Sequence, residues 1–176
     1  MTKNEAGAIV KMISTFYPNE YAKLTPEAMA MVVEMWAVTC EVYTGDQIAA
    51  AFQQFMATDV KGYGPKPGQL IQLICEPEDE KDLNENDAWS MVVRATGNGI
   101  YGAREEFEKL PPLVQRAIGN DYNIHEMAMR ELTSVDESSF KRTYRELLAR
   151  ERQKRRMPPS TWKRLEGGDE PLGLPV

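Results

Sequence analysis

The chain has 176 residues, of which 42% are hydrophobic and 27% are charged, and its formal net charge is −6. This length accommodates one domain or two small ones, and we interpret it as two small units. No apolar run reaches the roughly 18 residues that a membrane span requires, and the N-terminus lacks the apolar core of a signal peptide. We therefore expect a soluble intracellular protein without a membrane partner.

The sign of the charge reverses along the chain. Residues 76–87 contain seven acidic residues and one lysine, whereas residues 141–164 contain ten Lys and Arg against Glu146 and Glu151. A cationic segment on an acidic protein is typical of a region that contacts a partner. Nucleic acid, an acidic protein surface or the chain's own acidic segment would each neutralise the positive charge of this segment.

Few residues offer metal or catalytic chemistry. His125 is the only histidine, and Cys40 and Cys75 lie within apolar helical patterns, which predicts buried, reduced thiols. The Gly-rich residues 62–69 lack the Gly-Lys-Ser/Thr ending of a phosphate loop, which predicts a turn. We expect no cofactor, no metal and no catalysis, and an enzyme is the third and weakest hypothesis.

Apolar side chains at helical spacing predict four helices before residue 76. The first follows a capping box formed by Thr2 and Glu5, the second starts at Thr25 with Pro26, and the third follows a second capping box that begins at Thr44. A loop over residues 59–68 precedes a short fourth helix. These helices predict an N-terminal helical domain over residues 1–75.

The second half of the chain reads as a separate helical region. Residues 76–87 carry almost no apolar side chain, which predicts a solvated acidic linker. Asn86 then caps a helix containing Trp89, and short helices on either side of Pro111-Pro112 follow, with Gly119 as a terminator and a capping box at residues 123–126. No segment has strand periodicity, so the fold class is all-α, with a C-terminal helical region over residues 88–157.

The last helix begins near Ser134 or Asp136, and its apolar face gives way to an almost wholly charged sequence. Residues 158–176 are rich in Pro and Gly and predict a flexible tail. We infer a partner-binding surface here, with four apolar anchors among cations, although Tyr144 fits a core position better and Trp162 fits an exposed ring equally well. The candidate partner-binding residues are Tyr144, Arg145, Leu147, Leu148, Arg152, Lys154, Arg155, Arg156, Trp162, Lys163 and Arg164.

Two sets of short motifs resemble those of phage replicative-helicase loader/inhibitor proteins. The first set lies in residues 9–74 and comprises Phe16-Tyr-Pro18, Leu24-Thr-Pro-Glu27, Trp36, Ala49-Ala-Ala-Phe-Gln-Gln-Phe55 and Pro65-Lys-Pro-Gly-Gln-Leu-Ile71. The second set is similar to longer relatives and comprises Ala88-Trp89, Tyr101-Gly102, Glu105-Glu-Phe-Glu-Lys-Leu-Pro-Pro112, Val114-Gln-Arg-Ala-Ile-Gly119, Phe140-Lys-Arg-Thr-Tyr144 and Arg150-Glu-Arg152. The resemblance covers roughly residues 5–160.

The resemblance implies a small helical protein in the bacterial host cytoplasm that binds a hexameric replicative helicase, restrains it and delivers it to an initiator at the phage origin. The helicase would supply the ATP hydrolysis. In the family the C-terminal part contacts the helicase, which corresponds here to residues 140–164. The alternative from the residues alone is a nucleic-acid-binding accessory protein that uses the same basic segment on single-stranded DNA.

Overall fold

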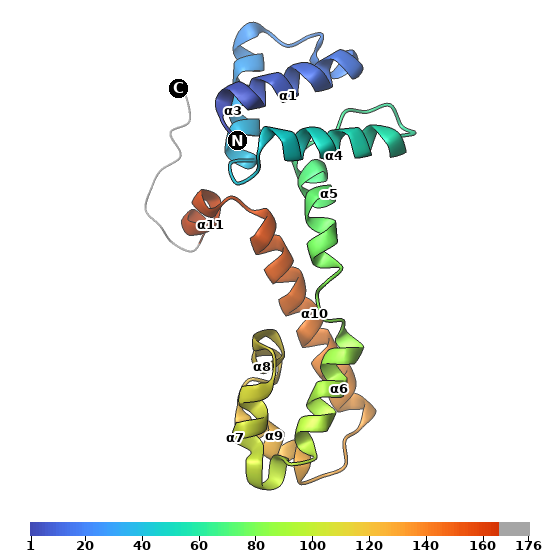
Figure 1. Ribbon diagram of the computed structural model, residues 1–176, viewed down its shortest axis with the longest axis vertical. Coiled ribbons are helices and arrows are strands. Elements are labelled where there is room, and N and C mark those ends of the chain that lie inside the picture. Colours follow the sequence, from blue (N-terminus) through green and yellow to red (C-terminus); the bar gives the residue numbers. More distant parts are fainter. Residues whose placement is uncertain (166–176) are drawn as a thin grey trace. The chain divides into compact units, whose positions relative to one another are not determined.

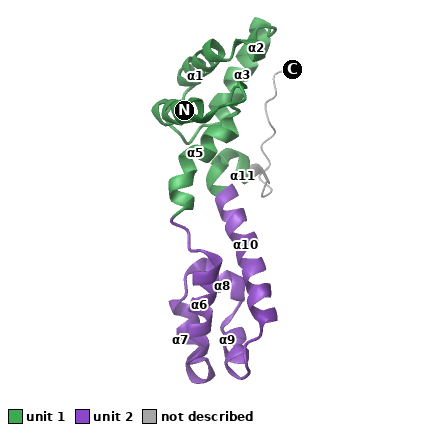
Figure 2. Cartoon of the chain, turned by 90° about the vertical axis from the view of Figure 1, so that its right-hand side faces the viewer, with its two compact units in different colours: residues 1–80, 154–176 green, residues 81–153 purple. Residues whose placement is uncertain are grey.

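The computed structural model describes residues 1–165, and within them the chain forms helices and no strand (Figure 1). The predicted all-α class is therefore confirmed. The chain divides into two compact units, of which unit 1 comprises residues 1–80 and 154–176 and unit 2 comprises residues 81–153 (Figure 2). The helices are α1 Lys3–Phe16, α2 Pro18–Tyr21, α3 Pro26–Thr39, α4 Gly45–Thr58, α5 Pro67–Asp79, α6 Glu85–Thr96, α7 Gly99–Lys109, α8 Pro112–Ile118, α9 Asp121–Ala128, α10 Ser134–Arg156 and α11 Pro159–Leu165.

The starts of three helices in unit 1 are fixed by local side chains, as the sequence predicts. Thr2 and Glu5 form a reciprocal capping box, in which Thr2 N–H donates to Glu5 Oε2 at 2.7 Å and Glu5 N–H donates to Thr2 Oγ1 at 3.3 Å. Thr44 and Gln47 repeat this arrangement before α4. Thr25 accepts a hydrogen bond at the start of α3. Each cap satisfies amide groups that the first helical turn leaves without partners.

The core of unit 1 is built from α1, α4 and α5 and from one side of α3, whose half-buried apolar residues pack against it. The fully buried side chains include Ile13 of α1, Phe52 of α4 and Leu70 of α5. Helix α3 contributes only Trp36 to the buried residues, although ten of its fourteen residues are Ala, Val, Met or Trp. Cys40, which follows α3, is fully buried, and this burial raises the pKa of its thiol to about 11.

Unit 2 packs α6 to α9 around the first part of α10. Trp89, Phe140 and Tyr144 form a row of rings whose successive centroids are 5.5 and 5.8 Å apart. Helices α7 and α9 approach closely at Gly99, where a Cβ atom would lie 2.8 Å from Ala128 Cβ. Gly119 ends α8 with a φ of +98°, so it supplies the predicted terminator.

The acidic segment is more ordered than the sequence predicts. Helix α5 continues through residues 76–79 and α6 begins at Glu85, so that only residues 80–84 of the expected linker lie outside helices. The cap of α6 is Asn84, not Asn86, because Asn84 Oδ1 accepts the N–H groups of residues 86 and 87. Likewise, α9 starts at Asp121 after the Asn120 cap, two residues before the expected capping box.

The expected tail beyond residue 157 begins with a helix. Helix α11 covers Pro159–Leu165, and Ser160 donates from its N–H and its hydroxyl to Glu41 Oε1, at 3.2 and 2.8 Å. These contacts, together with buried Pro158, order a segment that lacks an apolar core pattern of its own. The remainder of the expected tail, residues 166–176, lies outside the described residues.

Candidate functional site

Helix α10 carries most of the candidate partner-binding residues, and its first half belongs to the core of unit 2. Tyr144 is buried, and its hydroxyl donates to the Leu83 carbonyl at 2.8 Å. Leu148 is half-buried and packs against the same core, and Leu147 is half-buried. Tyr144 is therefore a core residue and does not serve as an exposed anchor, because its apolar neighbours and its hydrogen bond come from within unit 2.

Two arginines of α10 pair with acidic residues of unit 2. Arg145 donates from Nε and Nη2 to the two carboxylate oxygens of Glu85, at 2.8 and 2.9 Å. This bidentate contact holds the pKa of the Glu85 carboxyl below its ordinary value. Arg152 Nε donates to Asp82 Oδ2 at 2.8 Å. Acidic residues of the chain itself thus form ion pairs with some cations of the basic segment.

The end of α10 makes equivalent contacts within unit 1. Arg155 Nη2 lies 3.2 Å from Asp79 Oδ1, and Arg156 donates to Asp79 Oδ2. The Asp79 side chain is only 9% exposed, whereas the two arginines are about one-third exposed. Lys154 Nζ lies 5.0 Å from the centroid of the Trp162 ring, within the range of a cation–π contact. These residues fasten the end of α10, together with α11, to α5.

Three cations of the basic segment have no ion-pair partner within residues 1–165: Arg142, Arg150 and Lys163, all of them exposed. Of these, only Lys163 belongs to the candidate set. The Arg164 side chain lies outside the described part of the structure. The candidate residues therefore separate into core, internally paired and exposed groups, which sequence spacing alone does not distinguish.

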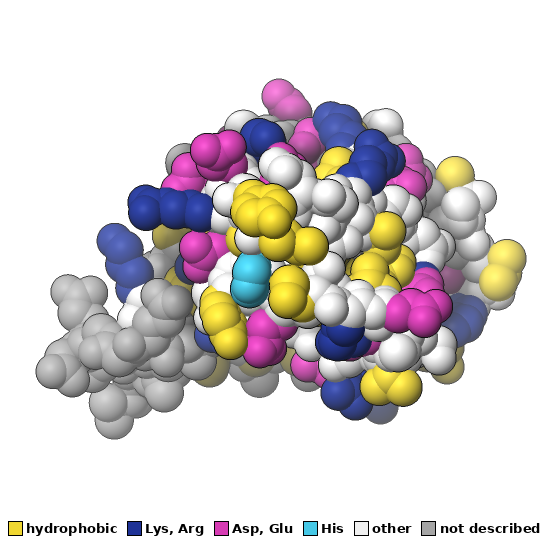
Figure 3. Space-filling view, turned by 90° about the horizontal axis from the view of Figure 1, so that it is seen from below, with side chains coloured by type: hydrophobic (Ala, Val, Ile, Leu, Met, Phe, Trp, Pro, Cys, Tyr) yellow, Lys and Arg dark blue, Asp and Glu magenta, His cyan; other side chains and the backbone are white. Residues whose placement is uncertain are grey.

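Unit 2 exposes a group of apolar side chains that lie outside the candidate partner-binding set. Tyr101 is 96% exposed, and Tyr122, His125 and Met129 line a cavity of about 300 Å³ with Glu126 and Arg130. Figure 3 shows this face, where hydrophobic side chains gather around the histidine. His125 Nδ1 lies 3.3 Å from the Gly99 carbonyl oxygen. Helical spacing identifies such residues as apolar but does not reveal that they are exposed.

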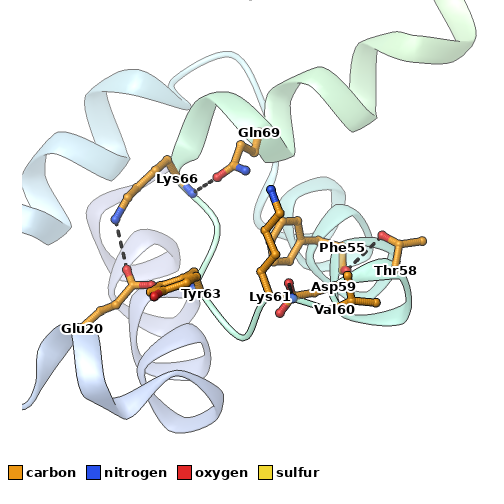
Figure 4. A pocket seen from close by; sticks show the side chains of 10 residues that line it. Glu20, Phe55, Thr58, Asp59, Val60, Lys61, Tyr63, Lys66 and Gln69 are labelled. Carbon is orange, nitrogen blue, oxygen red and sulfur yellow. Dashed lines mark hydrogen bonds and ion pairs between the residues drawn. The ribbon is translucent and has the colours of Figure 1, made fainter.

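Unit 1 has a cavity of about 680 Å³ beside the loop that connects α4 to α5 (Figure 4). Two of its charged side chains pair with each other, since Lys66 Nζ lies 3.0 Å from Glu20 Oε2, and the Lys66 N–H donates to Gln69 Oε1. Asp59 accepts from the N–H groups of residues 61 and 62. Residues 62–66 of the Gly-rich stretch thus form a loop whose start is held by local hydrogen bonds, and residues 67–69, expected to belong to a turn, are the first residues of α5.

A second cavity of unit 1, of about 480 Å³, is mostly apolar. It shares Glu20 and Lys66 with the first, and α3 contributes Met31, Met35 and Trp36 to its lining. The Glu20–Lys66 pair therefore lines both cavities.

Residues 1–165 contain no helix long and apolar enough to cross a membrane. Within the same residues, no cluster of three His, Cys, Asp or Glu side chains is arranged to hold a metal ion.

These features define an all-helical protein of two units with charged and apolar surfaces suited to contacts with other proteins. Residues 1–71 match the family model for the N-terminal domain of a phage helicase loader/inhibitor. The resemblance inferred from sequence is confirmed for these residues, and for residues 72–160 it stays a prediction. No curated protein and no solved structure matches the chain.

Proposed function

We propose that this protein binds a hexameric replicative helicase, restrains it and helps to load it at a phage origin in the bacterial host cytoplasm. The observation that carries the proposal is the match of residues 1–71 to the N-terminal domain of a phage helicase loader/inhibitor. That family consists of replication accessory proteins. The ATP hydrolysis that accompanies unwinding would then belong to the helicase.

The proposed helicase contact uses the exposed side of α10 in unit 2, and α11 of unit 1 is proposed as a further contact on its own. Arg142 and Arg150 are exposed and have no ion-pair partner within residues 1–165, so an acidic surface can attract them without breaking an internal pair. Leu147 of α10 and Trp162 of α11 are half-buried, and each adds apolar area near cations. In this proposal Arg145, Arg152, Arg155 and Arg156 position the helices through their acidic partners.

The same exposed cations would also suit nucleic acid, which is the second candidate function. The internal pairing of Arg145, Arg152, Arg155 and Arg156 weighs against it, because each pair must be broken before its arginine can contact a phosphate. The family match points to a helicase partner and supports neither single-stranded DNA nor an origin-bound initiator.

The test is binding of the full chain to an immobilised hexameric replicative helicase, measured by biolayer interferometry. Charge reversal of Arg142 and Arg150 to Glu should weaken binding at least about tenfold, because the new carboxylates would repel the acidic surface that the two cations attract. Arg94→Glu is the matched control, since Arg94 is also exposed on unit 2. Equal binding by the double variant and the control would show that the helicase does not contact this side of α10. Capture of single-stranded DNA without capture of the helicase would favour the second function.

A further inference from the structure

Helix α3 is the most apolar helix of unit 1 and yet is poorly covered. Ten of its fourteen residues are Ala, Val, Met or Trp, but Trp36 is its only buried residue. Met31 and Met35 are 56% and 57% exposed. A helix that is apolar on nearly all sides is ordinarily buried on nearly all sides. The exposed side of α3 therefore has the character of a surface that another element covers.

Leu24, which precedes α3, and three residues of α3 form one continuous stripe. Leu24, Ala28, Met31 and Met35 follow one another at spacings of three or four residues, and all line the apolar cavity of about 480 Å³. Tyr21 and Pro65 also line this cavity. At 1.5 Å per residue, the helical part of the stripe, from 28 to 35, is roughly 11 Å long, which is about two turns of a helix. Flexible methionine side chains adapt to the shape of a docked helix.

Carboxylates border this stripe. Glu27 and Glu34 lie beside it on α3, and Glu20 belongs to the cavity lining. Glu34 lies 2.6 Å from Lys3 Nζ, and Glu20 pairs with Lys66, whereas Glu27 has no ion-pair partner within residues 1–165. Hydrogen bonds from its own backbone N–H and from Thr25 hold the pKa of Glu27 below its ordinary value.

Unit 1 as a whole also carries a net negative charge. Residues 1–80 contain five lysines and no arginine against eleven Asp and Glu, a net charge of −6, and residues 154–176 of the same unit add five Lys and Arg against three Asp and Glu, so that unit 1 has a net charge of −4. The cations that α10 brings to unit 1 are engaged elsewhere, with Arg155 and Arg156 at Asp79 and Lys154 over Trp162. The field around the α3 stripe therefore favours a cationic partner.

We propose that the α3 stripe is a docking groove for a basic amphipathic helix of a partner protein. Three apolar side chains of that helix, spaced three or four residues apart, would occupy the groove, and Lys or Arg on its flank would face Glu27, whose carboxylate has no ion-pair partner within residues 1–165. This groove lies within the residues that match the family model and is separate from the proposed surface on α10 and α11. The protein thus has one surface for the helicase and another for a second contact, and the two proposals can fail independently.

The experiment uses the full chain with methionine methyl groups labelled with ¹³C. The probe is a synthetic amphipathic helix of about five turns built from Leu and Lys, and its control has Glu in place of every Lys. The Leu/Lys peptide should shift the ε-methyl resonances of Met31 and Met35 and leave that of Met129 unchanged. It should bind at least about tenfold more tightly than the Leu/Glu peptide, because Glu27 beside the groove has no ion-pair partner within residues 1–165 and unit 1 carries a net negative charge.

Variants make the assignment specific. The double substitution of Met31 and Met35 to Glu should weaken binding of the Leu/Lys peptide at least about tenfold, because it places carboxylates where apolar anchors dock. Met129→Glu is the matched control, since Met129 is 64% exposed and lies in unit 2. The milder double substitution to Gln tests the same surface should the Glu variant fail to fold.

Three results would overturn the proposal. Equal binding of the two peptides would show that charge does not select the partner helix. Unchanged binding by the double variant would show that the peptide does not dock on the α3 stripe. Light scattering without peptide gives the oligomeric state. If the unmodified protein is a dimer and the double variant is a monomer, the α3 stripe is a self-association surface.

Discussion

Replacing Asp79 with Asn should lower the free energy of unfolding by about 2 kcal/mol, because it removes the charge that holds two guanidinium groups. The Asp79 side chain is 9% exposed, and it contacts both Arg155 and Arg156. A hydrogen bond to a charged group contributes about 1.5–3 kcal/mol when shielded from water. Because the arginine side chains are 39% and 34% exposed, solvent reduces each contribution to about 1 kcal/mol. Asn keeps the shape and one acceptor oxygen, so little packing is lost.

Differential scanning calorimetry of the full chain measures this effect. A loss of about 2 kcal/mol lowers the transition temperature of a protein of this size by roughly 4–8 °C. Glu80→Gln is the control, because Glu80 is the next residue, is exposed and has no ion-pair partner in the described part of the chain. If the Asp79 variant melts within about 1 °C of the unmodified protein, the paired arginines do not fasten the end of α10 to α5 as inferred.

Three further predictions concern unit 2. Gly99→Ala should cost about 1–3 kcal/mol in urea unfolding, because its Cβ would lie 2.8 Å from Ala128 Cβ. Gly68→Ala, whose Cβ meets nothing within 4 Å, should not be destabilising, and equal effects would refute the close packing of α7 on α9. Tyr144→Phe should cost about 1 kcal/mol in the same assay, since the Leu83 carbonyl loses a donor at 2.8 Å, and a neutral result would contradict that bond. Arg130 holds the pKa of Asp136 below its ordinary value, so the stability gained from this carboxylate is present above about pH 4 and is lost as the pH falls further. Asp136→Asn should therefore reduce the acid dependence of the transition temperature, and an unaltered dependence would show that the pair contributes nothing.

The parts of the fold that sequence reasoning predicted depend on residues close together in the chain. The capping boxes at Thr2 and Thr44 join residues three positions apart, and the apolar stripes of α1 and α4 repeat every three or four residues. Such interactions are visible in a local pattern because both partners lie within one or two helical turns. These local patterns were therefore enough to predict the fold class and the starts of these helices.

The parts that sequence reasoning missed depend on distant residues. Ser160 of α11 donates a hydrogen bond to Glu41, and Arg156 of α10 donates one to Asp79 at the end of α5. The two partners are 119 positions apart in the first pair and 77 in the second. A polar segment without such partners cannot offset its ordering entropy, and that argument led to the predictions of a linker and a tail. Opposite charges in two segments indicated attraction, but did not indicate which carboxylate meets which arginine.

The candidate site shows the same division. Sequence spacing placed Tyr144, Leu147 and Leu148 on one face of α10, and the structure buries Tyr144 and covers part of the two leucines. The exposed apolar residues are instead Met31 and Met35 of unit 1 and Tyr101 of unit 2. Helical periodicity marks a side chain as apolar, whereas its exposure depends on whether another element packs over it.

Binding of this protein to a replicative helicase can be tested by size-exclusion chromatography with light scattering. The full chain is mixed at micromolar concentration with a purified hexameric replicative helicase, with and without ATP. We expect a stable co-eluting complex whose mass gives the number of bound chains. Separate elution under both conditions would contradict it.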